Sequence, residues 1–192
     1  GEWQPQLAHW EFIPWFIQHI GELEDSRKKY TTLNATAEKL FESKLYQAAA
    51  KARRCLVLST GFYEWRHFKG ADDKKPIAYP YFIHSANKEE PLFYMAGIWQ
   101  PWTDKLSGEM IHSFAIVTTQ ANGLMQKIHN TKKRMPTILP PELAEEWIGP
   151  LREKRIKELA TYQLPEAALN AHTIAKDFNR GITNPQEAVE YT

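Results

Sequence analysis

Cysteine is almost absent from the 192-residue sequence, which contains Cys55 alone. A single thiol excludes an internal disulfide framework and the structural zinc sites that need several thiolates. Long hydrophobic runs are missing too: no apolar stretch approaches the roughly 20 residues that cross a bilayer, and the sequence has no signal-like start. We therefore expect a protein of the reducing cytoplasm that has no contact with a membrane.

A strong net charge is also lacking. Lys and Arg number 24 against 23 for Asp and Glu, so the formal net charge is +1. The chain as a whole therefore does not indicate a polyanionic partner, and any contact with nucleic acid must come from local basic clusters. Repeats, low-complexity tracts and Pro/Gly/Ser-rich linkers are absent as well. The length is typical of one domain, which we place at residues 1–192.

The sequence does contain enough apolar surface for a core. It is 43% hydrophobic and 12% aromatic, which excludes global disorder. Periodicity predicts helices over 37–51, 121–129, from Pro140 onward and over 151–160. Strands are expected near 9–16, with an end at Pro14, and over 54–59, 62–68, 77–84, 92–99, 111–118, 135–139 and 172–175. This order predicts an α+β fold with flanking helices and a largely antiparallel sheet that could curl into a barrel.

Ordered motifs carry more information than the composition. LNATAE covers residues 33–38, RRCLVLSTGFYEW covers 53–65, and IVTTQAN covers 116–122 and is followed by IHN and RMP. Together with the Trp10–Trp15 segment, they resemble the SOS-response-associated peptidase (SRAP) family, whose pattern reads WGLIPxW, NARxET, RRCLxPxxGFYEW, VTTxAN and IHxRMPxIL. The resemblance runs from about residue 10 to 139 and is weaker near 171–179.

The resemblance implies a protein that binds single-stranded DNA and crosslinks to abasic sites in it. In this family the cysteine exposed by removal of the initiator methionine is the nucleophile. Its α-amine forms a Schiff base with the ring-opened sugar, and its thiol closes a thiazolidine; the same residue gives the family its autopeptidase activity. The sequence here begins Gly1-Glu2-Trp3. We therefore expect that an N-terminal segment with the nucleophile is missing from it.

Three catalytic residues follow from the resemblance. Asn34 matches the asparagine beside the nucleophile, although the residues alone equally allow it to cap the following helix. Glu64 lies in an aromatic strand, where burial would raise its pKa into a range useful for acid–base catalysis; the alternative is a solvent-facing position. His129 ends a predicted helix and matches the histidine that protonates the opening sugar. We expect the three side chains to converge in one pocket.

The DNA contacts predicted from the sequence are Arg134, Trp65, Arg53 and Arg54. Arginines neutralise phosphates and make the affinity for DNA sensitive to salt, and Trp65 could stack on unpaired bases. Thr36 stands where the family has an arginine, so a phosphate contact there is lost or supplied elsewhere. Two lysines, at 132 and 133, are inserted relative to the common IHxRMP spacing.

Other candidate groups receive a structural interpretation. Cys55 is expected to be buried and not the nucleophile. The six histidines other than His129 lack the spacing of metal ligands, so we expect no metal and no cofactor. Two functional alternatives stay open beside the crosslinker: a peptidase that uses the same site, and a non-catalytic single-stranded nucleic-acid-binding module.

Overall fold

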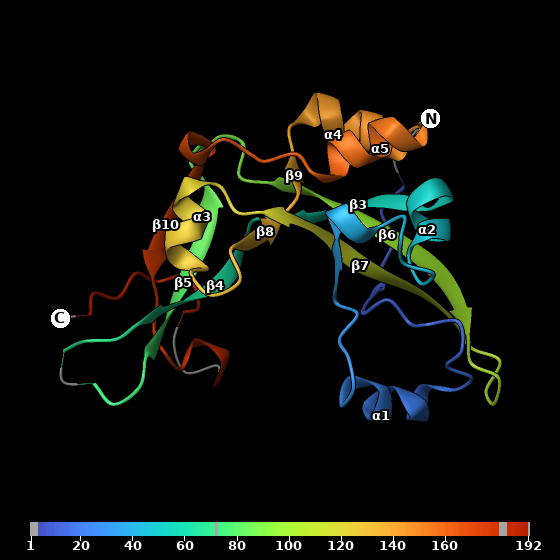
Figure 1. Ribbon diagram of the computed structural model, residues 1–192, viewed down its shortest axis with the longest axis horizontal. Helices are drawn as coiled ribbons and strands as arrows, with labels where there is room; N and C mark the ends of the chain where they lie inside the picture. Colours follow the sequence, from blue (N-terminus) through green and yellow to red (C-terminus); the bar gives the residue numbers. More distant parts are fainter. Residues whose placement is uncertain (1–3, 72, 181–183, 192) are drawn as a thin grey trace.

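The computed structural model describes residues 4–71, 73–180 and 184–191. Its strands form two sheets (Figure 1). In the larger sheet the order is β1 (His9–Trp10), β7 (Met110–Gln120), β6 (Phe93–Thr103), β3 (Arg54–Ser59), with β2 (Asn34–Thr36) and β8 (Arg134–Pro136) paired to β7 and β9 (Ile138–Leu139) paired to β6. The smaller sheet has the order β10 (Leu169–Thr173), β5 (Ile77–Ser85), β4 (Gly61–Phe68).

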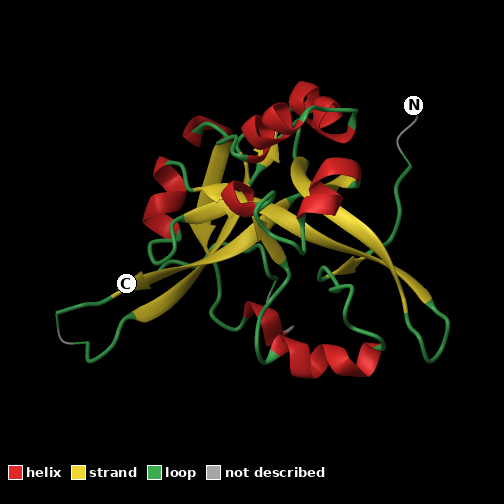
Figure 2. Cartoon of the chain, turned by 45° about the vertical axis from the view of Figure 1, so that its right-hand side comes forward, coloured by secondary structure: helices red, strands yellow, loops and turns green. Residues whose placement is uncertain are grey.

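Short helices flank both sheets. They are η1 (Ile20–Glu22), α1 (Leu23–Arg27), η2 (Ala37–Lys39), α2 (Gln47–Ala52), α3 (Gly123–Ile128), α4 (Pro141–Ile148), α5 (Glu153–Ala160), η3 (Glu166–Ala168) and η4 (Phe178–Arg180). Figure 2 shows that helices lie on opposite sides of the strands, and Figure 1 identifies them as α4 and α5 on one side and α1 on the other. The predicted α+β class with flanking helices is therefore confirmed, whereas the strands that the structure describes do not close into the expected barrel.

Pairing in the described strands is mostly antiparallel, as expected, with two exceptions. β1 and β2 both pair with β7 in parallel. The strand expected near 9–16 is only two residues long, because the chain turns toward a different partner: the Phe12 amide donates to the Thr32 carbonyl at 3.1 Å, and Pro14 has no amide hydrogen to give. The sheet is therefore mixed.

The helix expected over 37–51 is wrong as a single element. It divides into η2 and α2, and turns connect them. The Ser43 hydroxyl accepts a hydrogen bond from the Leu45 amide at 3.3 Å, which is the local competition through which serine interrupts helices. The apolar spacing is nevertheless meaningful, since Leu40 and Ala49 are both fully buried.

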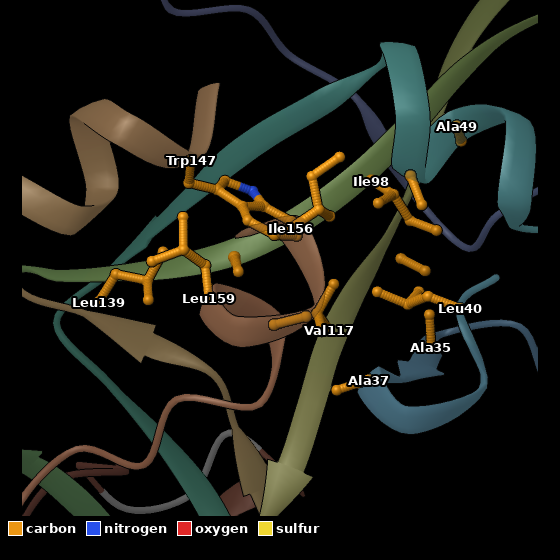
Figure 3. Packing of buried hydrophobic residues seen from close by; sticks show 14 of the residues in the cluster. Ala35, Ala37, Leu40, Ala49, Ile98, Val117, Leu139, Trp147, Ile156 and Leu159 are labelled. Carbon is orange, nitrogen blue, oxygen red and sulfur yellow. The ribbon is translucent and has the colours of Figure 1, made fainter. Parts of the chain in front are cut away.

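Two apolar clusters hold the elements in place. The first joins α2, α4 and α5 to β6 and β7, and Figure 3 shows Trp147 beside Ile156 and near Leu139 and Leu159 within it. The second packs α3 against strands of both sheets through Met125, Ile128, Ile83 and Met95. Burial of Met125 and Ile128 fixes the orientation of α3, and so the place of the residue that follows it, His129.

No helix within the described ranges is long and apolar enough to cross a membrane.

Candidate acid–base site

Glu64 lies in the middle of β4, where it pairs with Tyr81 of β5. Side chains alternate along a strand, and here the alternation separates two environments. Tyr63 and Trp65 contact the ring of Phe178, at centroid distances of 4.7 and 6.0 Å. Glu64 instead shares the opposite face with Phe62, which packs into the second apolar cluster. The carboxylate thereby lies on the face of β4 that meets the end of α3, where His129 contacts it. Figure 1 shows α3 close to β4.

Gly61 explains why this strand can begin where it does. A Cβ atom at this position would lie 2.5 Å from the Ile83 carbonyl oxygen and 2.5 Å from the Phe82 ring. Only glycine permits this approach between β4 and β5. Close packing against β5 therefore requires the glycine of GFYEW, and the pairing that it permits sets the register of Glu64.

His129 is positioned by the ends of α3. At the start of the helix, the Asn122 carboxamide accepts from the Met125 amide at 3.0 Å and donates to the Leu164 carbonyl at 2.8 Å. At its end, the His129 amide donates to the Met125 carbonyl at 2.8 Å. The asparagine of the VTTQAN motif is thus a helix cap, a role that sequence reasoning left unassigned although an Asn before an apolar helix is a recognisable cap signal.

The structure brings Glu64 and His129 together, although 65 positions separate them. His129 Nδ1 lies 3.5 Å from Glu64 Oε1, and 23% of the Glu64 side chain and 17% of the His129 side chain are exposed. His129 Nδ1 also lies 2.9 Å from the Arg134 carbonyl oxygen. A carbonyl only accepts, so Nδ1 carries a proton and donates it to this oxygen. Nε2 is consequently the imidazole nitrogen that this hydrogen bond leaves available.

Burial controls the charge of this pair. Removal from water raises the pKa of Glu64 above its ordinary value, and this effect exceeds the opposing pull of His129, the Trp65 amide and Lys132 on the same pKa. The carboxyl therefore holds its proton to higher pH than an exposed glutamate. A largely buried carboxyl and an imidazole in contact form a pair that can donate and accept protons.

Asn34 is placed by β2 and not by a helix cap. It pairs through its backbone with Ile116 of β7, and Thr36 is the residue that precedes η2. Its side chain is exposed, and it has no hydrogen-bond partner in the part of the chain that the structure describes. No contact joins it to Glu64 or His129 among these residues, so convergence of all three side chains stays a prediction.

Arg134 is held by an internal ion pair. Its guanidinium donates to both carboxylate oxygens of Glu38, at 3.0 and 2.9 Å, and also to the Thr118 carbonyl. The same pairing lowers the pKa of Glu38. β2 and β8 both pair with β7, so the bridge links the segment that follows β2 to β8. Much of the positive charge expected at Arg134 is therefore balanced within the protein.

The other three predicted DNA contacts divide into two groups. Trp65 follows Glu64 in β4, on the opposite face of the strand, and is 40% exposed, so part of its ring is available to a ligand. Arg53 donates to the Trp99 carbonyl at 3.2 Å. Arg54 donates to the carbonyls of Ala50, Lys51, Trp147 and Gly149 and lies over the Trp147 ring. Arg54 thus joins α2 to the end of α4 and has a structural role.

Replacement of Arg54 by alanine should therefore lower the stability of the fold and leave the affinity for DNA unchanged. Loss of a charged donor from several carbonyls should cost about 1.5–3 kcal/mol of unfolding free energy. Arg53→Ala, which removes a single bond, is the matched control and should cost less. Urea unfolding and binding of a single-stranded oligonucleotide would measure both quantities. Normal stability with weakened binding would instead make Arg54 a DNA contact.

Cys55 is not an activated thiol. Burial raises its pKa to about 12, so the thiolate is scarce near neutral pH. Its Sγ lies 2.8 Å from the position that a Cβ on Gly97 would occupy, which shows how closely β3 and β6 pack around it. Among the described residues, no group of three or more His, Cys, Asp or Glu side chains could hold a metal ion.

Comparisons with known proteins define the relationship. The family model described as "SOS response associated peptidase (SRAP)" matches residues 1–181. The chain belongs to this family. It is 33% identical over 127 residues to the abasic site processing protein YoqW of Bacillus subtilis, which covers 66% of the chain and 52% of YoqW. It is 29% identical over 195 residues to the abasic site processing protein HMCES of Xenopus tropicalis, covering 94% of the chain and 55% of HMCES.

The fold is shared with a solved structure from Bacteroides thetaiotaomicron. That protein is 37% identical, superposes with a TM-score of 0.80, and the match covers 95% of this chain and 73% of the other. A second structure, from Bordetella bronchiseptica, has a TM-score of 0.71 at 22% identity over 88% of this chain and 76% of the other. The chain spans about half the length of the curated relatives it matches.

Proposed function

We propose that this SRAP domain carries the acid–base site of a protein that captures abasic sites in single-stranded DNA as a covalent thiazolidine crosslink. The observation that carries the proposal is the Glu64–His129 contact at 3.5 Å, with a carboxyl whose pKa is raised by burial. The abasic site processing proteins named above support the substrate. The nucleophile in this proposal is an N-terminal cysteine, which these 192 residues do not contain.

The chemistry needs several proton transfers at one carbon atom. The α-amine of the cysteine adds to the aldehyde carbon of the ring-opened sugar, and the resulting hydroxyl leaves as water to give an imine. The thiol sulfur then adds to the imine carbon, and its proton ends on the ring nitrogen. The α-amine suits this role because its pKa of about 7.7–8.0 leaves a neutral fraction at physiological pH.

Glu64 and His129 have complementary parts in these steps. A protonated Glu64 can give its proton to the departing hydroxyl and take one back from the nitrogen as the imine forms. In the ring closure the same carboxyl can give its proton to the ring nitrogen and take the proton of the thiol. His129 Nε2 can protonate the sugar ring oxygen as the ring opens, since Nδ1 stays bonded to the Arg134 carbonyl. In the same proposal, the Asn34 carboxamide orients the amine, and the exposed face of Trp65 stacks on a neighbouring base.

One observation favours a second function for the isolated chain. Its sole thiol, Cys55, is partly buried, and a pKa raised to about 12 keeps it protonated near neutral pH. Without another thiol these residues could bind single-stranded nucleic acid but not close a thiazolidine. The test that follows separates the crosslinker from the non-catalytic binding module. The autopeptidase reaction needs the same N-terminal thiol as the crosslinker.

The test compares the 192-residue chain with the protein translated from its native start codon. Both are incubated with a uracil-containing oligonucleotide treated with uracil glycosylase and then run on a denaturing gel. The native-start protein should give a heat-stable adduct. The 192-residue chain should give none, because the α-amine of Gly1 forms at most a reversible Schiff base. Absence of an adduct from both proteins, with binding retained, would favour the non-catalytic module.

A heat-stable adduct from the 192-residue chain that Cys55→Ala abolishes would contradict the assignment of the nucleophile.

A further inference from the structure

The segment between His129 and Arg134 forms a fixed turn beside the acid–base site. The Lys133 amide donates to the His129 carbonyl at 2.9 Å, and the Lys133 carbonyl accepts from the Ala121 amide at 3.0 Å. Lys133 has a φ of 51°, the left-handed conformation that closes such a turn. The insertion noted in the sequence is therefore an ordered turn in the structure.

Asn130 attaches this turn to the strand that carries Glu64. Its Oδ1 accepts from the His67 amide at 3.0 Å, and its Nδ2 donates to the His67 carbonyl at 2.7 Å. The carboxamide thus pairs with β4 as a neighbouring strand would. Since His67 lies three residues after Glu64 on β4, this clamp fixes the turn next to the site.

Lys132 is a cation of this turn that has no internal partner among the described residues. Its side chain is exposed, and no carboxylate or hydrogen-bond partner contacts its ammonium in the described part of the chain. Of the other cations nearby, Arg134 pairs with Glu38 and Lys127 of α3 lies 4.0 Å from Glu166. Lys133 of the same turn and Arg66 of β4 are exposed like Lys132. Lys132 also lies near enough to Glu64 for its charge to lower the pKa of that carboxyl.

The opposite flank of the site offers no replacement for this charge. Thr36 of β2 pairs with Thr118 of β7, and Arg134 donates to the Thr118 carbonyl on the other side. A neutral hydroxyl therefore stands at position 36, and Arg134, the arginine bonded to the same part of β7, is already balanced by Glu38. A phosphodiester entering the site would meet its free positive charge on the turn after His129.

We propose that Lys132 binds a backbone phosphate next to the abasic sugar, and that the Asn130–His67 clamp holds the turn in place for this contact. The inference rests on the proposed function and assigns the phosphate contact of the same site. It predicts that Arg134, which the sequence favoured for this role, acts mainly through its ion pair with Glu38. Lysine suits the contact because its ammonium is a compact charge that needs no planar partner.

The experiment measures binding of a fluorescent single-stranded oligonucleotide by anisotropy over a series of salt concentrations. For single-stranded DNA, loss of one phosphate contact reduces the magnitude of the slope of log affinity against log salt concentration by about 0.7. Lys132→Ala should show this decrease, so the ratio of its affinity to the wild-type affinity should be about fivefold lower at 0.1 M salt than at 1 M salt. Lys132→Arg should restore the slope.

Lys133→Gly is the matched control. It removes the same charge from the same turn, and glycine suits the left-handed backbone of that position, so the turn should be kept. Its slope should stay at the wild-type value. A wild-type slope in Lys132→Ala, or an equal decrease in Lys133→Gly, would overturn the assignment to Lys132.

These outcomes are distinct from failure of the proposed function. Adduct formation by the native-start protein with an unchanged slope in Lys132→Ala would overturn only this inference. No binding of single-stranded DNA by the wild-type chain would contradict both proposals. Thermal unfolding of each variant should give the wild-type midpoint, because Lys132 has no internal partner whose loss could weaken the fold.

Discussion

Replacement of Glu64 by glutamine should slow formation of the abasic-site adduct by about 10²–10⁴-fold, the usual contribution of a positioned acid–base group. Glutamine has nearly the same shape and can fill the same site between β4 and α3. It can neither donate nor accept a proton in the reaction. The measurement is the rate of adduct formation in the native-start protein, followed on denaturing gels at saturating oligonucleotide.

The same substitution should stabilise the fold at neutral pH. Burial raises the pKa of Glu64 in the folded state, so the folded protein binds its proton more tightly than the unfolded chain does. Stability is therefore lost as pH rises from the unfolded pKa through the folded pKa, at about 1.4 kcal/mol for each unit between them. Glu64→Gln removes that loss, so its advantage should appear above this window and vanish below it.

Glu145→Gln on α4 is the matched control, because Glu145 is an exposed carboxylate. It should change neither the rate nor the pH dependence of stability. A Glu64→Gln protein that reacts at the wild-type rate would contradict the catalytic assignment. A Glu64→Gln protein that is less stable than the wild type at neutral pH would contradict the account of the raised pKa.

Trp147→Ala should cause the largest loss of stability, about 3–5 kcal/mol of unfolding free energy. Trp147 is fully buried at the centre of the first apolar cluster (Figure 3). Its indole nitrogen donates to the carbonyls of Cys55 and Gly97, at 3.0 and 3.3 Å. Alanine would leave a cavity, two carbonyls without this donor, and no ring beneath Arg54.

Trp147→Phe separates packing from hydrogen bonding. Phenylalanine keeps most of the apolar contact and loses the donor, so its cost should be clearly smaller than that of alanine. Urea unfolding with linear extrapolation measures both variants. A loss of less than about 1 kcal/mol in Trp147→Ala would show that α4 is not anchored by this ring.

The strands of the central region could be predicted because their signals are local. The expected strands at 54–59, 62–68, 77–84 and 111–118 differ from the observed ones by at most two residues at either end. The parallel pairing of β1 and β2 with β7 depends on contacts between segments distant in the sequence, which alternation of apolar residues does not encode. The helix expected over 37–51 failed for a related reason: its apolar spacing reports burial, which the turns around Ser43 also satisfy.

The sequence motifs predicted which residues form the candidate site, but not how those residues are arranged in space. The motifs identified Glu64 and His129, and the fold brings them together. Arg134 occupies its expected position in the RMP motif. Its partner Glu38 lies on a distant segment of the chain, and no spacing in the sequence predicts that the two residues pair. Arg54 likewise read as a surface charge, whereas its donors reach carbonyls at the end of α4, more than ninety positions away.

The pKa of Glu64 tests the central claim most directly. Carbon-13 NMR of the chain labelled at the glutamate carboxyl carbons, with Glu64→Gln used to assign the signal, would follow its titration. The account predicts a midpoint above about 4.3, the value of an unperturbed glutamate. A Glu64 midpoint at or below the unperturbed value would contradict the view that β4 and α3 hold a buried, proton-carrying carboxyl beside His129.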